Sequence, residues 1–97
     1  MKCLQIYYSD SFDEEVTQYV EKCGVTKLSR IRDVQGWVTG GEPRLGDDVW
    51  PGLNYLLIVF ADDGVIGRVV DGLADFKRSN EGILLKAFIL PAEEVNA

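Results

Sequence analysis

Two amphipathic helical segments, each flanked by strand-like segments, constrain the fold of this 97-residue chain more than any other feature. In the first, residues 11–23, apolar side chains recur at helical spacing and acidic residues lie near the start. The second, residues 62–78, carries its apolar residues at the same spacing and ends in Lys77 and Arg78. Short apolar runs bounded by turn residues precede and follow each helix, which is the pattern of strands. The predicted strands are residues 2–8, 25–36, 53–60 and 83–90.

The element order is therefore strand, helix, strand, strand, helix, strand, within a length that suits a single domain over residues 1–97. One four-stranded antiparallel sheet with both helices on one face satisfies this order. The sequence thus predicts an α+β fold of the ferredoxin-like βαββαβ type. Many unrelated functions use this fold, so function has to be argued from particular residues.

Local signals predict where the elements begin and end. Ser11 and Glu14 have the spacing of a capping box at the start of the first helix, and Gly24 is expected to end that helix. The imperfect period of residues 25–36 predicts a long strand with a bulge or bend. The nearly all-apolar run 53–60 is typical of a strand that is central in a sheet or buried on both faces. Pro91 is expected to stop the last strand.

The second helix carries further signals at its start and in its interior. Asp62 or Asp63 is expected to cap it. Three glycines lie within it, and each destabilises a helix interior by about 1 kcal/mol relative to alanine. We therefore expect its backbone to approach a sheet or a neighbouring subunit closely. These glycines are Gly64, Gly67 and Gly72.

Composition excludes several classes of function. The net charge of −6 disfavours binding to nucleic-acid phosphates, and no histidine is present to serve as a general base, a triad member or a metal ligand. Neither GxxxxGK[ST] nor GxGxxG occurs. Cys3 and Cys23 are predicted to be buried free thiols. No run approaches the ~20 apolar residues of a membrane span, and no signal peptide is recognisable, so we expect a cytoplasmic protein.

Residues 37–52 form a long insert between the second and third strands. The insert holds both tryptophans and two of the three prolines of the chain. Loops longer than about 12–15 residues are commonly functional. Two interpretations stay open: the insert is a contact surface for a partner, or it packs back on its own protein. Its candidate partner-binding residues are Glu42, Arg44, Leu45, Asp47, Asp48 and Trp50.

Several segments together resemble the nitrogen-regulatory PII family and its divergent PII-like relatives. Gly24-Val25-Thr26 and the strand ending in Val34-Gln35-Gly36-Trp37 resemble the family's second strand, which leads into its T-loop. Trp50-Pro51 resembles the "LP" that opens the third strand, and Ala61-Asp62-Asp63 resembles the start of the second helix. The most specific match is Lys86-Ala87-Phe88-Ile89-Leu90-Pro91-Ala92-Glu93-Glu94, which resembles "KIFVLPVEE". The resemblance covers nearly the whole chain in the right order.

This resemblance implies a regulatory protein rather than an enzyme. Family members form homotrimers with their sheets facing inward, bind small effectors in clefts between subunits, and act on a partner through the T-loop. PII-like relatives often accompany membrane transport systems, so the implied target is a protein such as a transporter. Carried onto this chain, the T-loop is residues 37–52, and the implied ligand-binding residues are Gly36, Trp37, Val38, Thr39 and Lys86.

The chain departs from the family where the family binds phosphate. The loop that reads "TG..GDGK" in the family reads Ser79-Asn80-Glu81-Gly82-Ile83-Leu84-Leu85-Lys86 here, and only the lysine stays in register. The glycine, arginine and glutamine expected after Gly36 become Val38, Thr39 and Gly40, and Gly52 replaces the basic residue after "LP". These departures argue against ATP binding in the usual PII manner, so the effector is left unidentified.

Two alternatives belong to other classes. The chain is also similar in its predicted fold to trimeric CutA-type proteins, which would imply metal binding through Cys3, Cys23 or the group Glu42, Asp47 and Asp48. Val34-Gln35-Gly36 resembles the phosphate-binding "VQG" of acylphosphatases. In that family, however, the motif follows the first strand and ends in an arginine, whereas here it ends the second strand and Trp37 follows.

Overall fold

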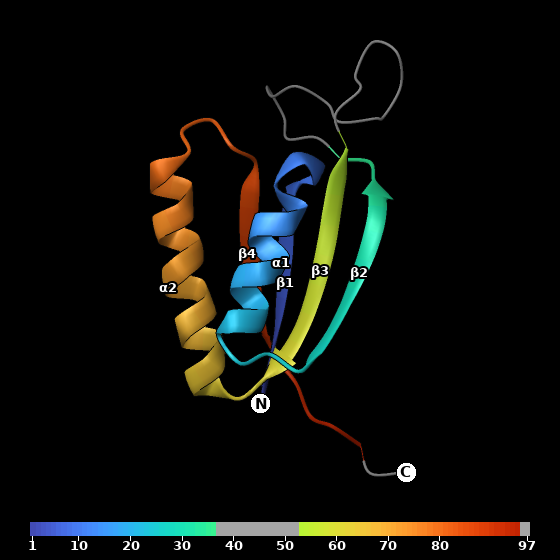
Figure 1. Ribbon diagram of the computed structural model, residues 1–97. Coiled ribbons are helices and arrows are strands. Elements are labelled where there is room, and N and C mark those ends of the chain that lie inside the picture. The colour runs from blue at the N-terminus through green and yellow to red at the C-terminus, as the bar shows by residue number, and fades with distance from the viewer. Residues whose placement is uncertain (37–52, 96–97) are drawn as a thin grey trace.

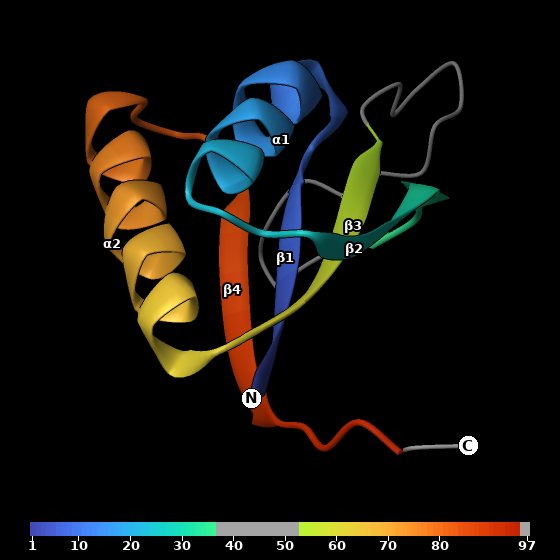
Figure 2. The same ribbon diagram turned by 60° about the horizontal axis from the view of Figure 1, so that its bottom comes forward.

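A computed structural model describes residues 1–36 and 53–95 of the chain. They form one four-stranded antiparallel sheet with both helices on the same face (Figures 1 and 2). The elements are β1 (Lys2–Ser9), α1 (Asp13–Lys22), β2 (Lys27–Val34), β3 (Asn54–Ala61), α2 (Asp63–Ser79) and β4 (Leu85–Pro91). The strand order across the sheet is β2-β3-β1-β4. The predicted ferredoxin-like βαββαβ fold is confirmed.

The register of the sheet follows from its central strand, β1. Ser9 of β1 lies opposite Asn54 of β3, and Lys2 lies opposite both Ala61 of β3 and Pro91 of β4. β3 is also central, as its apolar sequence predicts. The last strand begins at Leu85 rather than at residue 83, and Pro91 is its final residue instead of lying beyond it.

β2 contains the predicted bulge. Ile31 pairs with Leu56 and Val34 pairs with Asn54, so two residues of β2 lie opposite the single residue Tyr55. One of these two, Asp33, has a left-handed backbone with φ of 59°. The extra residue keeps Ile31 and Val34 on the same face of the sheet. Val34, two residues before Gly36, therefore faces the side away from the helices, as Ile31 does.

The core lies between the sheet and the helices. Leu4 and Ile6 of β1 and Leu57 and Val59 of β3 are fully buried against apolar residues of both helices. The helix residues that bury most completely are Val16, Val20, Ile66, Val69 and Leu73. These positions follow the helical spacing seen in the sequence, so the apolar stripes of both helices are confirmed.

The predicted capping box at the start of the first helix is wrong. Asp10–Phe12 form a 3₁₀ turn, α1 begins only at Asp13, and no side chain caps it. The Ser11 hydroxyl lies 3.0 Å from the Ser9 hydroxyl, so it bonds to a residue before the 3₁₀ turn instead of to a backbone amide of α1. The end of the helix is as predicted, because Gly24 has a φ of 99° that other residues rarely adopt.

α2 begins as predicted, with Asp62 as its cap: the side chain accepts a hydrogen bond of 2.9 Å from the Val65 amide. Of its three glycines, Gly72 is the one in close contact. A Cβ placed there would lie about 2 Å from the Tyr19 ring of α1. Within the chain, the close neighbour of Gly72 is therefore the other helix rather than the sheet.

Candidate functional site

The sheet has a second face that no described residue covers, which we call the open face. It is formed by alternate residues of all four strands, on the side away from both helices. Its members are Cys3, Gln5, Tyr7, Lys27, Ser29, Ile31, Leu56, Ile58, Phe60, Lys86, Phe88 and Leu90. This face is apolar over most of its area although it lies outside the core.

Large apolar side chains on the open face are exposed to solvent. Phe88 is 53% exposed and packs edge-on against the Tyr7 ring. Ile31 is 47% exposed, and Phe60 and Leu90 are each at least 40% exposed. Contiguous exposed apolar patches of this kind commonly mark interaction sites. The open face is therefore a candidate interface of the described residues.

One end of the open face carries polar groups, and we call it the loop end because β2 finishes and β3 begins there. Ser9 and Asn54 pair across β1 and β3 at this end, and both are buried. Within residues 1–36 and 53–95, Oδ1 of Asn54 has no hydrogen-bond partner. Gly36 lies beside the same amide, since a Cβ on Gly36 would be 3.4 Å from Nδ2 of Asn54. A buried amide oxygen without a partner is unfavourable by about 1–3 kcal/mol.

Lys86 is the cation of the open face near this end. It lies opposite Tyr7 of β1, one strand away from Leu56 of β3. The open face contains a second lysine, Lys27, but both carboxylate oxygens of Glu94 lie 2.9 Å from its ammonium group. Within the described residues Lys86 has no such carboxylate, so its charge is available to an anion.

Two of the predicted ligand-binding residues, Gly36 and Lys86, lie in the described part of the chain. Gly36 follows β2 and Lys86 lies on β4, and these strands form the opposite edges of the sheet. Three strand spacings separate them, which amounts to about 14 Å. One small ligand therefore cannot contact both within a single protomer.

The remaining predicted site residues lie outside the described part of the chain. These are Trp37, Val38 and Thr39 for the ligand, and Glu42, Arg44, Leu45, Asp47, Asp48 and Trp50 for the partner.

Asn54 is a further candidate site residue, and it is not among those predicted from the sequence. Its signal was present, because it is a polar residue at the head of an otherwise apolar run.

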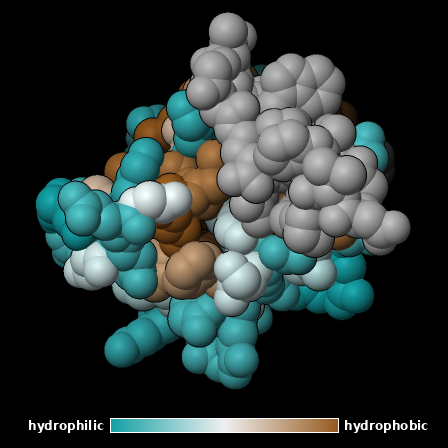
Figure 3. Space-filling view, turned by 90° about the horizontal axis from the view of Figure 1, so that it is seen from above, coloured by the Kyte–Doolittle hydropathy of each residue, from teal (hydrophilic) through white to brown (hydrophobic). Residues whose placement is uncertain are grey.

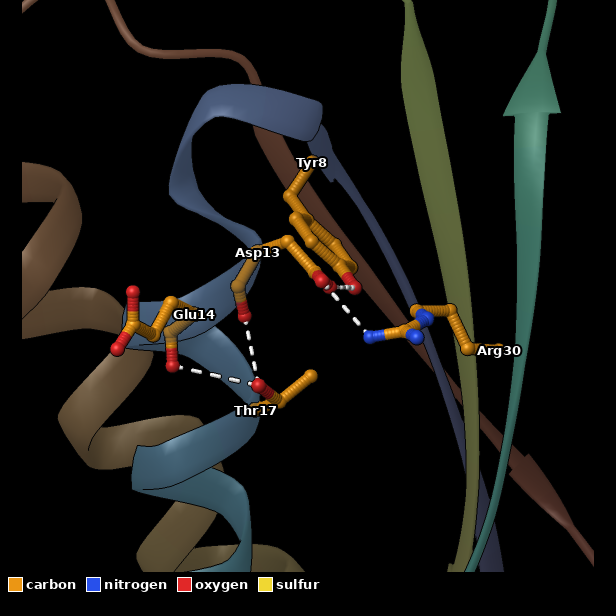
Figure 4. Close-up of polar contacts among 5 residues, drawn as sticks. All are labelled: Tyr8, Asp13, Glu14, Thr17 and Arg30. Carbon is orange, nitrogen blue, oxygen red and sulfur yellow. Dashed lines mark hydrogen bonds and ion pairs between the residues drawn. The ribbon is translucent and has the colours of Figure 1, made fainter.

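A polar cluster joins α1 to the sheet on the helix side (Figure 4). The Tyr8 hydroxyl donates to Oδ1 of Asp13 at 2.6 Å, and Arg30 of β2 donates to Oδ2 at 2.7 Å. Arg30 also lies 6.0 Å from the centre of the Tyr55 ring. Burial and the hydrogen bond to the Asp13 carboxylate raise the pKa of Tyr8 above its ordinary value. Because every member of this cluster has a partner, we assign it a structural role.

A pocket lies between α1 and α2. Val16, Leu73 and Phe76 contribute apolar surface, and Glu15 and Asp75 contribute carboxylates. Figure 3, which looks onto the loop end, shows apolar surface in a hollow beside α2. Asp75 is already ion-paired with Arg78 on the same helix. This pocket therefore lacks a set of polar groups that converge on a ligand.

Neither cysteine contributes to a metal site in the described residues. Cys3 is buried on the open face, whereas Cys23 caps the C-terminal end of α1 in the helix layer. Within residues 1–36 and 53–95, no three side chains of the metal-ligating types cluster together. The acidic group of the CutA-type alternative, Glu42, Asp47 and Asp48, lies outside these residues.

Comparison with protein-family models and with curated proteins finds no match. Comparison with solved structures finds PII-like proteins. CPII of Thiomonas intermedia K12, a nitrogen-regulatory PII-like protein bound to ADP, AMP and bicarbonate, superposes with a TM-score of 0.72. The match covers 92% of this chain and 84% of that chain at 15% sequence identity.

Two further structures agree. A protein of Thermus thermophilus described as PII-like signalling gives a TM-score of 0.72 at 16% identity, with 92% of this chain and 83% of that chain covered. The apo form of CPII gives 0.63 at 13% identity, with coverage of 92% and 89%. The chain therefore has the fold of PII-like signalling proteins, and the predicted resemblance is confirmed at that level.

Among the described residues, neither α1 nor α2 combines the length and the apolar character that crossing a bilayer requires.

Proposed function

We propose that this chain is a non-enzymatic, PII-like regulatory protein of the cytoplasm that binds a small effector and controls a partner protein. The observation that carries the proposal is the open face: an apolar sheet surface whose loop end holds an unpaired lysine and an unpaired buried amide oxygen. An enzyme of this fold would need catalytic groups, and the polar cluster at Tyr8 is internally satisfied.

We propose that the open face is buried at the centre of a homotrimer. Exposed aromatic and aliphatic side chains on a sheet gain about 25 cal/mol for each Å² that is removed from water. In a closed threefold arrangement the three open faces meet at the centre and the three loop ends gather at one end of the assembly. Gly36 of one copy then lies near Lys86 of another copy. One ligand could contact both residues, although about 14 Å separates them within a single copy.

The effector is proposed to be a small anion, or a ligand with an anionic group, bound in these clefts between subunits. Lys86 supplies the positive charge, and Gly36, Trp37, Val38 and Thr39 supply the wall formed by the start of the loop. Asn54 adds a hydrogen-bond acceptor for a donor group on the ligand. The similar protein CPII was solved with ADP, AMP and bicarbonate, so these compounds are the first candidates.

Residues 37–52 are proposed to be the output segment. Glu42, Arg44, Leu45, Asp47, Asp48 and Trp50 would contact the target, for which a membrane transporter is the leading candidate. Tryptophan and arginine are the residues most favoured as binding anchors. Arg44 also matches the planar geometry of a carboxylate on the partner.

The proposal is tested by light scattering and calorimetry on the full chain. We expect a particle of three times the 10.8 kDa protomer mass, and heat of binding with bicarbonate, AMP or ADP. Lys86→Met should weaken effector binding at least roughly tenfold, since it removes a charge-assisted hydrogen bond of about 1.5–3 kcal/mol. Lys22→Met, on an exposed position of α1, is the matched control. A monomeric particle would exclude the trimer, and equal binding by the two variants would exclude Lys86 as a ligand residue.

A further inference from the structure

The two helices are in close contact at one place and leave a hollow beyond it. At Gly72 of α2 the Tyr19 ring of α1 lies so near that no Cβ would fit, and the Tyr19 hydroxyl donates to the Arg68 carbonyl at 3.0 Å. From this contact toward the loop end, a hollow of about 360 Å³ lies between the helices and reaches Ser79, the last residue of α2. Its length along α2 is about 10 Å at 1.5 Å per residue, which is enough for two large apolar side chains one helical turn apart.

The floor of this hollow is apolar. Val16 of α1 and Leu73 of α2 form its buried part. The half-buried Phe76 ring continues the floor and packs edge-on against Phe12, with 5.5 Å between the ring centres. Figure 3 shows this apolar surface in the hollow beside α2. The floor therefore offers contact area to apolar side chains without a polar group at its base.

The rim of the hollow is negatively charged. Glu15 of α1 and Asp75 of α2 line it at exposed positions, and Asp71 lies one turn before Asp75 on the same side of α2. Arg78 pairs with Asp75, whereas neither Glu15 nor Asp71 has an ion pair with a described residue. Among the described residues, no lysine or arginine lines the hollow. An apolar floor is therefore bordered by carboxylates that lack a cation.

We propose that this hollow, which we call the helix groove, is a docking site for a basic amphipathic helix of a partner protein. Two apolar side chains at positions i and i+4 of that helix would cover the floor, and lysines or arginines beside them would meet Glu15, Asp71 and Asp75. A helix suits the site because its rows of side chains pack into the spaces between the side chains of neighbouring helices.

The helix groove stays accessible in the proposed trimer. Both helices lie on the face of the sheet opposite the open face, so burial of the open face does not cover their outer side (Figures 1 and 2). No described strand residue lines the groove, so neither edge of the sheet takes part in it. None of the groove residues belongs to the proposed effector site or to the output segment, so the inference goes beyond the proposed function and is tested separately from it.

The test uses the full chain and three synthetic blocked peptides of about 18 residues, a length at which isolated helices form. The basic peptide carries leucines at i and i+4 among lysines and alanines. In the acidic peptide glutamate replaces each lysine, and in the scrambled peptide the leucines no longer share one face. We expect the basic peptide to shift the methyl NMR signals of Val16 and Leu73 in a saturable way. The other two should bind at least roughly tenfold more weakly in fluorescence anisotropy, the loss expected when one leucine stays in water.

Two variants separate the contribution of the rim from that of the floor. Glu15→Gln should weaken binding of the basic peptide about two- to fivefold, as the loss of one exposed ion pair does. Glu21→Gln removes the same charge from an exposed position of α1 outside the groove and should leave the affinity unchanged. Ser79→Trp places a large side chain at the open end of the groove and should weaken binding at least roughly tenfold, whereas Gln18→Trp, exposed and outside the groove, should not.

Four results would overturn the proposal. Equal affinity for the basic and acidic peptides would show that the rim does not select charge. Equal losses in Glu15→Gln and Glu21→Gln would show attraction to the net charge of −6 rather than to the groove. Unchanged methyl signals of Val16 and Leu73 at a millimolar concentration of basic peptide would show that the groove stays empty. Changes in the same signals when the free protein is diluted would show that a second copy of the chain already occupies it.

Discussion

The two faces of the sheet have similar apolar sequences but different environments. On the helix side, Leu57 and Val59 of β3 are fully buried. On the open face, the next residue of the same strand, Phe60, is 40% exposed. A strand that is apolar on both faces is normally covered on both. The fold supplies one covering layer, and under the trimer proposed above association would supply the other.

This comparison also separates residues that stabilise the single chain from residues that are proposed to mediate its assembly. The helix side needs nothing from outside, because its side chains fill the space between the sheet and the helices. In the proposed trimer, the open face would be covered by a surface of the same apolar character. Substitutions on the two faces should accordingly be visible in different measurements.

The largest effect is expected on the helix side, from Leu57→Ala. Leu57 is fully buried between β1 and the helices, so truncation leaves a cavity and should lower the free energy of unfolding by about 2–5 kcal/mol. Urea denaturation at fixed protein concentration measures this loss. A decrease below about 1 kcal/mol would mean that the site collapses around the smaller side chain and that the core is less tightly packed than the structure shows.

The second effect is expected on the open face, from Ile58→Glu. Ile58 lies at the middle of this face, between Gln5 of β1 and Ser29 of β2. A carboxylate there would be buried without a partner in an assembled trimer, so we expect a folded monomer of 10.8 kDa in light scattering with an unchanged circular dichroism spectrum.

The control for this substitution is Thr26→Glu, which adds the same charge at an exposed position before β2. It should keep the mass of the wild-type particle. If Ile58→Glu also kept that mass, the open face would not be the assembly interface, and the comparison between the faces would lose its explanation.

Sequence alone predicted the parts of the molecule that depend on periodicity. The strands and helices follow from apolar spacing, and even the bulge in β2 was visible as a break in its period. The predicted capping box is wrong because other contacts engage the residues at the start of α1: Asp13 accepts hydrogen bonds from Tyr8 and from Arg30, which is 17 positions away, and Ser11 bonds to Ser9. Gly72 was recognised as a close approach, but its neighbour Tyr19 lies in another helix, 53 positions earlier in the chain.

The candidate site was less predictable than the fold. Lys86 was found through a family resemblance, but nothing in the sequence places it about 14 Å from Gly36, because that separation depends on the order of strands in the sheet. Asn54 stands out in the sequence only as a polar residue in an apolar run; its burial depends on the pairing of β1 with β3.

The third effect concerns the helix side at alkaline pH. In the folded protein burial and the Asp13 carboxylate raise the pKa of Tyr8 above its unfolded value near 10. The neutral phenol therefore contributes stability that is fully present below pH 10 and is lost as pH rises from 10 toward the folded pKa. Relative to Tyr8→Phe, the wild type should lose up to about 1.4 kcal/mol per pH unit above pH 10.

This pH dependence is measured by urea denaturation of both proteins between pH 8 and 11. Below pH 10 the wild type should be more stable by about 1.5–3 kcal/mol, the contribution of a hydrogen bond to a charged group. Parallel pH profiles for the two proteins would show that the Tyr8 hydroxyl is not held by Asp13 in solution.

The smallest effect is expected at the end of the open face opposite the loop end. There the carboxylate of Glu94 binds the ammonium group of Lys27, and both side chains are more than half exposed. Exposed pairs of this kind contribute about 0.2–1 kcal/mol, so Glu94→Gln should leave the free energy of unfolding nearly unchanged.

If the open face is buried by association, the same substitution leaves Lys27 without its partner beside that interface. Glu94→Gln should then weaken trimer assembly in sedimentation analysis more than it weakens folding. Glu93→Gln, at a neighbouring position that has no such pair with any described residue, should affect neither. Equal behaviour of the two variants would place residues 92–95 outside the interface and limit the association surface to the strands themselves.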